Sequence, residues 1–239
     1  MSGSGPIVVG VTGASGVVYA QRLVQVLLDE GQDVFLVASS AARRVIREEL
    51  AGGADTEHIF RFEGTARPLV FSERDFGAPF CSGSFRFRGM AIVPASMGTI
   101  GAIASGVSHH SIHRGADVAL KERRPLVVVP RETPFSTIHL ENLLTLARAG
   151  AVVLPPSPGF YHRPESIGDQ VDFIVSRILD LLGVENALIR RWADGLSEAA
   201  DKAATGAAPD AASEADRAAG PFPSAGSLSA SERDLRRPH

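Results

Sequence analysis

Small and hydroxyl-bearing residues recur in this sequence directly after short apolar runs. Residues 10–16 read Gly-Val-Thr-Gly-Ala-Ser-Gly, and residues 94–99 read Pro-Ala-Ser-Met-Gly-Thr, with Ser96 placed to cap a helix. Hydroxyl groups and free N–H groups at a helix start bind phosphate, because the first turn leaves its N–H groups unpaired. Both segments therefore predict phosphate cradles, and an ordinary turn with a serine cap is the alternative.

A charged pair follows another apolar run. Arg131 and Glu132 come directly after residues 126–130, which read Leu-Val-Val-Val-Pro. An ion pair at the mouth of a buried strand is well placed to bind an anion with an acid or base beside it. The competing interpretation is a bridge to a neighbouring subunit or loop.

Further cations and one aromatic hydroxyl lie on the segments that flank these runs. Arg114 and Lys121 are seven residues apart, so they share a helix face, and Asp117 between them is spaced to pair with both. Tyr161 lies in a proline-rich loop, and Arg177 lies on the next helical pattern. Taken alone, the helical cations are more typical of a solvated surface than of a binding site.

Three histidines fall close together, in the segment His-His-Ser-Ile-His at residues 109–113. The segment looks like a metal cluster, but no carboxylate stands at metal-ligand spacing from it. Adjacent histidines also point in different directions on a helix. We therefore expect His109, His110 and His113 to serve helix packing or a subunit contact.

The glycine pattern and the second strand end bear on the kind of nucleotide. The first segment has the spacing G-x-x-G-x-x-G, whereas dinucleotide-binding folds use G-x-G-x-x-G. After the apolar run at residues 34–38 come Ser39 and Ser40, where a dinucleotide fold usually places a ribose-binding Asp or Glu. Both departures favour a mononucleotide over NAD.

The elements that position these residues follow a regular alternation. Short apolar runs, rich in β-branched residues, predict strands at residues 7–12, 34–38, 90–95, 126–130 and 151–154. Helical patterns lie between and after them at residues 17–30, 41–50, 99–105 with a continuation to 123, 136–149 and 166–182. This alternation predicts right-handed crossovers and an α/β fold with a doubly wound parallel sheet. In such a sheet, ligands bind beyond the carboxyl ends of the strands, where the candidate residues lie.

Composition limits the class of protein. The chain has 239 residues, one cysteine (Cys81) and a formal net charge of −3, so neither a disulfide scaffold nor a nucleic acid or anionic membrane partner is expected. No apolar run approaches the roughly 18–20 residues that span a bilayer. The amino terminus lacks the charged and apolar regions of a signal peptide, which predicts a cytoplasmic protein.

Composition changes near Trp192, after which Ala, Ser, Gly, Asp and Pro dominate. Such a stretch buries too little apolar surface to offset its ordering entropy. We therefore predict a flexible arm at residues 1–6, one folded domain at residues 7–195 and a disordered tail at residues 196–239.

Taken together, four stretches resemble the flavin prenyltransferase family of the UbiX type. They read GVTGASGVVYA, CSGSFRFRGMAIVPASMGT, ADVALKERRPLVVVPRETPFSTIHLEN and PGFYHRPESIGDQVDFIVSRILDLLG. The similarity runs from about residue 7 to residue 184, and the second and third stretches are long and nearly uninterrupted. The histidine segment and the long tail are the two departures from the family pattern.

The resemblance implies a flavodoxin-like or Rossmann-like three-layer sandwich that assembles into a homo-oligomer, a dodecamer in the family. It implies an enzyme that joins a dimethylallyl group from dimethylallyl monophosphate to N5 and C6 of reduced FMN. The product, prenylated FMN, then serves a separate partner decarboxylase. The sequence leaves the donor open between a monophosphate and a pyrophosphate.

Residue roles also follow from the resemblance. The residues implied to hold FMN are Gly13, Ala14, Ser15, Ser39, Ser96, Met97, Gly98, Thr99 and Arg131. Those implied to hold the allylic phosphate are Arg114, Lys121, Arg131, Tyr161 and Arg177, with Ser82 near the prenyl pocket. Ser15, Glu49 and Glu132 are the implied catalytic residues, and no metal is implied.

Two other functions compete with this interpretation. The first is an FMN-dependent decarboxylase of the same fold that acts on peptidyl or pantothenoyl cysteine. PASMGT resembles the PASANT motif of those enzymes, but their P-x-M-N-x-x-M-W segment is absent from the sequence. The second is a non-enzymatic flavin carrier, which would have no need for the second phosphate site that Arg114, Lys121, Tyr161 and Arg177 are implied to form.

Overall fold

A computed structural model describes residues 5–50 and 60–189, and within these residues six parallel strands form one sheet in the order β3-β2-β1-β4-β5-β6. The strands are β1 Ile7–Val11, β2 Val34–Ala38, β3 Leu69–Ser72, β4 Gly89–Ala95, β5 Leu126–Pro130 and β6 Val152–Val153. This is a doubly wound order, because the chain moves outward from β1 through β2 to β3 and then returns to β4 on the other side of β1. The predicted fold class is confirmed.

Seven helical segments connect and follow these strands in the described part of the chain. They are α1 Val17–Asp29, α2 Ser40–Glu49, the 3-10 turn η1 Pro79–Cys81, α3 Met97–Ala104, α4 Ser111–Lys121, α5 Thr137–Arg148 and α6 Ile167–Leu181. A serine hydroxyl caps the start of α2, α3, α5 and α6 by accepting an N–H from the first turn. Serine caps of this kind explain why these helices begin where they do.

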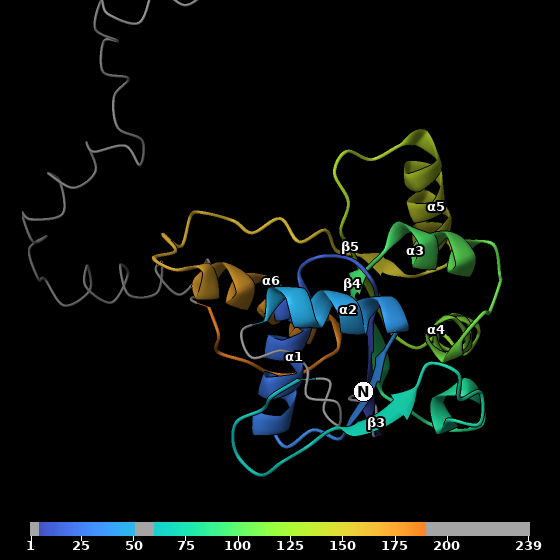
Figure 1. Cartoon of the computed structure of the whole chain (residues 1–239), viewed down its shortest axis with the longest axis horizontal. Helices are drawn as coiled ribbons and strands as arrows, with labels where there is room; N and C mark the ends of the chain where they lie inside the picture. The colour runs from blue at the N-terminus through green and yellow to red at the C-terminus, as the bar shows by residue number, and fades with distance from the viewer. Residues whose placement is uncertain (1–4, 51–59, 190–239) are drawn as a thin grey trace, which may run out of the picture. The chain divides into compact units, whose positions relative to one another are not determined.

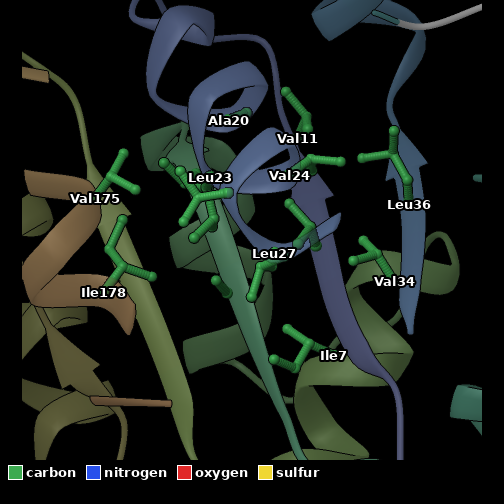
Figure 2. Close-up of a cluster of buried hydrophobic side chains, with 14 of the residues drawn as sticks. Ile7, Val11, Ala20, Leu23, Val24, Leu27, Val34, Leu36, Val175 and Ile178 are labelled. Atoms are coloured by element: carbon green, nitrogen blue, oxygen red, sulfur yellow. The ribbon is translucent and has the colours of Figure 1, made fainter. Parts of the chain in front are cut away.

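The helices cover the two faces of the sheet, and the strand residues alternate between them (Figure 1). Ile7 and Val9 of β1 pack with α1, α2 and α6, whereas Val8 packs with α3 and α4. Figure 2 shows the first of these clusters, in which Leu23 and Leu27 of α1 lie between the sheet and Ile178 of α6. Burial of a leucine of this kind stabilises the fold by roughly 1.5–3 kcal/mol relative to an exposed side chain.

Two local predictions about the elements were wrong. The helix expected at residues 99–105 does not continue to 123, because Gly106, with φ 71°, ends α3 and a separate helix starts at Ser111. Strand β3 was not predicted. It is an edge strand whose Leu69 and Val70 are 57% and 44% exposed, and its apolar run, Leu69 to Phe71, is shorter than the runs of the predicted strands.

The structure describes only part of the chain over which the domain boundaries were predicted. The tail at residues 196–239 and most of the arm at residues 1–6 lie outside the described residues, so the predicted domain division stays a prediction. In the part of the chain that is described, no helix has the length and apolar character needed to cross a bilayer.

Candidate active site

The loops after β1 and β4 meet at the point where the strand order reverses. Thr12, the first residue after β1, joins them: its N–H and its hydroxyl both donate to the Pro94 carbonyl, at 3.2 and 2.9 Å. The same hydroxyl accepts the Ser96 N–H at 2.7 Å. Arg131 is added to this edge because its N–H donates to the Ala95 carbonyl at 3.2 Å. The predicted residues of three strand ends therefore lie side by side at the carboxyl edge.

The first turn of α3 is open to an anion. Ser96 accepts the Thr99 N–H at 3.4 Å, and its hydroxyl donates to the Thr99 hydroxyl at 3.1 Å. Within the described residues, no hydrogen bond to the N–H of Met97 or Gly98 is found. A Cβ added to the exposed Gly98 would meet no atom within 4 Å. This turn keeps the free donors and the space that a phosphate needs.

The first turn of α1 is different, because it already holds a carboxylate. Glu49, the last residue of α2, accepts the Gly16 N–H at 2.9 Å and the Val17 N–H at 3.2 Å. Gly16 has φ 98°, a conformation that favours glycine, and Ser15 directly precedes it. Glu49 therefore lies beside Ser15, and its charge opposes a second anion at this helix start.

Close packing restricts the choice of residue in the loop between β1 and α1. A Cβ added to Gly13 would lie 2.5 Å from the Ala41 Cβ, so only glycine lets the loop approach the start of α2. Ser39, which caps α2, is 7% exposed, and its N–H donates to the Val11 carbonyl at 2.9 Å. Gly13, Ala14, Ser15 and Ser39 thus border the same edge as the open turn of α3.

A pocket of about 360 Å³ opens beside Arg131 and Glu132, between the segment 130–135 and the loop 155–157. Glu132 accepts the Thr133 N–H at 3.0 Å. The expected ion pair between Arg131 and Glu132 is not found among the described residues, so the Arg131 guanidinium remains available to an anion. Hollows of about 510 and 560 Å³ occur elsewhere, but neither is lined by a predicted site residue.

A second group of predicted residues lies on the α4 face of the sheet. The Arg114 guanidinium donates to the Cys81 carbonyl at 3.1 Å, and a Cβ on Gly83 would meet the Lys121 ammonium at 2.5 Å. Ser82 is in the same turn. Asp117 pairs with Arg114 but not with Lys121, which pairs with Glu122 instead, so the expected double pairing is wrong.

A third group lies along α6, on the opposite face. The Tyr161 ring packs against Phe173, with ring centroids 5.8 Å apart. Arg177 follows Phe173 by four residues, so the two side chains share one helix face, and it pairs with Asp180 at 3.1 Å.

One chain does not bring the five predicted phosphate ligands together. The helix α4, which carries Arg114 and Lys121, covers one face of the sheet, and α6 with Arg177 covers the other. Lys121 also precedes the start of β5, whereas Arg131 follows its end. A strand of five residues separates these positions by about 13 Å or more at roughly 3.3 Å per residue.

Burial shifts the pKa of two groups that the predicted site does not include. His113 is 5% exposed, its ring lies 3.7 Å from that of His110, and burial lowers its pKa to about 4. Burial raises the pKa of the Cys81 thiol to about 11, so it stays protonated and is no nucleophile. No group of three metal-ligating side chains is found among the described residues.

Sequence reasoning did not single out Thr12, which joins the two central loops. Its position could have revealed it. A hydroxyl at the end of a buried central strand can form hydrogen bonds only with the backbone groups of neighbouring strand ends. It also missed Glu73, whose carboxylate accepts the Ser40 N–H at 3.0 Å. That residue follows the strand that the sequence did not reveal.

Comparisons with known proteins agree with this geometry. The family model described as Flavoprotein matches residues 1–179. The flavin prenyltransferase UbiX of Methanocaldococcus jannaschii is 46% identical over 186 residues, which cover 78% of this chain and 97% of that protein. The flavin prenyltransferase UbiX of Thermoplasma acidophilum is 50% identical over 186 residues, with 78% and 99% covered.

Solved structures show the same similarity. The crystal structure of AnUbiX in complex with FMN and dimethylallyl pyrophosphate has a TM-score of 0.73 and 42% identity, covering 79% of this chain and 97% of that one. A dodecameric FMN-dependent UbiX-like decarboxylase from Escherichia coli has a TM-score of 0.72 and 39% identity, with 78% and 98% covered.

Proposed function

Because this chain belongs to the UbiX family of flavin prenyltransferases, we propose that it transfers a dimethylallyl group to reduced FMN. The observation that carries the proposal is the open first turn of α3 beside Arg131, at the carboxyl edge of the sheet. Free N–H groups, two hydroxyls and a guanidinium suit the phosphate of one mononucleotide. The same arrangement supports FMN as the flavin.

Glu49 supports a defined orientation for that flavin. Its carboxylate fills the first turn of α1, which in dinucleotide folds receives a pyrophosphate. The FMN phosphate is therefore placed at α3, and the loop from Gly13 to Ser15 is left to border the ring. The remaining proposed FMN ligands are Ser39, Ser96, Met97, Gly98, Thr99 and Arg131.

Reduced FMN supplies the nucleophilic ring atoms N5 and C6 when it is bound. Transfer breaks the bond between the allyl carbon and the phosphate oxygen, so cations must stabilise the charge that develops on the leaving phosphate. Glu132, at the edge of the pocket beside β5, takes and returns the ring proton. Glu49 holds the loop that carries Ser15, whose hydroxyl is proposed to act near N5.

The donor phosphate is proposed to be held by residues from more than one copy of the chain. In a single chain, α4 with Arg114 and Lys121 lies on the opposite face of the sheet from α6 with Arg177. A complete set is therefore proposed to need other copies, which contribute Arg114 and Lys121 or Tyr161 and Arg177. Enclosure between copies also excludes water from the reacting carbon. The proposed donor is dimethylallyl monophosphate, and Ser82 is assigned to the prenyl pocket.

Helix α5 supports a homo-oligomer, and we propose that its exposed face contacts a second copy. Leu140 and Leu144 are 53% and 49% exposed, Ile138 is 68% exposed, and only Leu146 of this helix is buried. An apolar flank of this kind is typical of a protein interface. The dodecameric relative from Escherichia coli makes a dodecamer the first assembly to test.

The remaining proposals concern the cellular setting. A protein with one buried cysteine suits the reducing cytoplasm, where we place it. The product is proposed to pass to a decarboxylase that uses prenylated FMN.

The deciding experiment is anaerobic incubation of the purified protein with reduced FMN and dimethylallyl monophosphate, followed by mass analysis of the flavin. We expect FMN enlarged by one dimethylallyl group, and a parallel reaction with the pyrophosphate identifies the preferred donor. Unchanged FMN with both donors contradicts the proposal. Release of CO2 from an added carboxylic acid, with FMN unchanged, favours a decarboxylase instead.

A further inference from the structure

The residue after β3 links two helices that the flavin site depends on. In the sheet, Ser72 pairs with Ala38, so Glu73 and Ser39 emerge next to each other at the carboxyl edge. Glu73 is partly buried, and its carboxylate accepts the Ser40 N–H at 3.0 Å. It therefore holds the first residue of α2, directly after the proposed FMN ligand Ser39.

The main chain of Glu73 is held by α4. Its carbonyl accepts the Ser111 N–H at 2.8 Å, and the Ser111 hydroxyl donates to the Ser72 carbonyl at 3.1 Å. Ser111 is fully buried, so these bonds are shielded from water. Because these bonds fix the Glu73 backbone, holding its carboxylate against α2 costs less conformational entropy.

Two hydrogen bonds hold Ser39, and one of them makes the orientation of its hydroxyl depend on α2. Its N–H donates to the Val11 carbonyl of β1 at 2.9 Å, and its hydroxyl accepts the Ala42 N–H at 3.1 Å. The second bond lies within the first turn of α2, the turn that Glu73 holds at Ser40. Movement of that turn would carry the Ser39 hydroxyl with it.

We propose that Glu73 is a positioning residue of the flavin site, which acts by holding the first turn of α2 and thereby Ser39. The inference rests on the proposed function only in taking Ser39 as an FMN ligand. A carboxylate at a helix start also suits the positive end of the helix dipole. Glu73 is not among the proposed FMN or donor ligands, so its effect is expected to pass through Ser39.

The test is a double-mutant cycle read as FMN affinity in the full-length protein. Glu73→Ala should weaken FMN binding about tenfold, and Glu73→Gln should restore most of it, because the amide oxygen still accepts the Ser40 N–H. Glu48→Ala is the matched control, since within the described residues that glutamate of α2 is found paired with the exposed Arg44, and it should leave FMN affinity unchanged. In a Ser39→Ala background, Glu73→Ala should add little further loss.

Three results would overturn the inference. They are full FMN affinity in Glu73→Ala with only a lowered melting temperature, additive losses in the cycle, or no rescue by Glu73→Gln. At saturating FMN, Glu73→Ala should keep the wild-type kcat and the wild-type KM for the donor. If the wild type binds FMN but forms no prenylated flavin, the proposed function fails while the cycle still decides the role of Glu73.

Discussion

At the scale of single residues, His113 gives the molecule a measurable response to acid. Folded His113 stays neutral down to pH about 4, whereas in the unfolded chain it takes up a proton near the ordinary value of 6.5. The unfolded state therefore binds more protons between these values, and stability falls as the pH drops from 6.5 towards 4. The loss reaches up to about 3 kcal/mol for a shift of this size.

We expect His113→Leu to flatten the dependence of the unfolding free energy on pH within that window. The same change at the exposed His109, whose charge is the smallest of the effects that lower the pKa of His113, is the control and should alter the slope much less. Denaturant unfolding at several pH values measures the effect. Equal slopes in the wild type and in His113→Leu would show that His113 is not the group responsible. His110, whose ring packs against that of His113, and Glu73, which lies near His110, are unchanged in both variants.

The proposed donor ligands and the acid/base residue make a second prediction at this scale. Arg177→Ala should leave FMN affinity intact but slow prenylation about ten- to a hundredfold, since one lost charge-assisted contact costs roughly 1.5–3 kcal/mol. Tyr161→Phe should act in the same direction. Glu132→Gln should bind both substrates yet fail to complete the product, because the amide cannot carry the proton. Full activity in Glu132→Gln, or loss of FMN binding in all three variants, would contradict these roles.

At the scale of elements, the sequence predicted those parts of the fold whose signal is local. Buried strands such as β5 read as continuous apolar runs, and Ser96 was recognised as the cap of the helix that follows β4. The edge strand β3 gave a weaker signal, because its apolar run of three residues is shorter than the runs of the predicted strands. Glu73, the residue that follows β3, was missed for the same reason. The pairing of Asp117 and the contact between Glu49 and α1 depend on tertiary packing, which spacing along the chain does not specify.

Helix α5 carries the prediction that belongs to this scale. Leu140→Glu combined with Leu144→Glu should break the oligomer, because burial of two carboxylates at an apolar contact is costly. Thr145→Glu adds the same side chain elsewhere on the exposed surface of α5 and should leave assembly unchanged. Light scattering after size exclusion gives the mass of each variant. An intact oligomer in the double variant would mean that another surface joins the copies.

At the scale of the whole molecule, the folded core should be independent of the tail predicted at residues 196–239. The strands and helices that form the proposed site lie within the described residues, and the tail sequence is poor in apolar side chains. Deletion of the tail should therefore change neither the melting temperature nor FMN affinity by more than a small amount. A large drop in either quantity would show that the tail packs on the core.

At the same scale, we propose that prenyl transfer depends on the division of the donor ligands among copies of the chain. Lys121 and Arg131 lie at opposite ends of β5, which favours the proposal that different chains supply them to one phosphate. Lys121→Ala and Arg131→Ala should each be nearly inactive alone. When the two variants are co-expressed, random assembly gives about a quarter of the shared sites both intact residues.

The most direct measurement is therefore the yield of prenylated FMN from the co-assembled Lys121→Ala and Arg131→Ala chains, compared with each variant alone. We predict that the mixed oligomer recovers about a quarter of the wild-type activity, while each pure oligomer stays inactive. If the mixed oligomer is as inactive as its parents although the wild type forms prenylated FMN, the two residues serve one site within a single chain. If the wild type itself forms none, the proposed prenyl transfer is wrong.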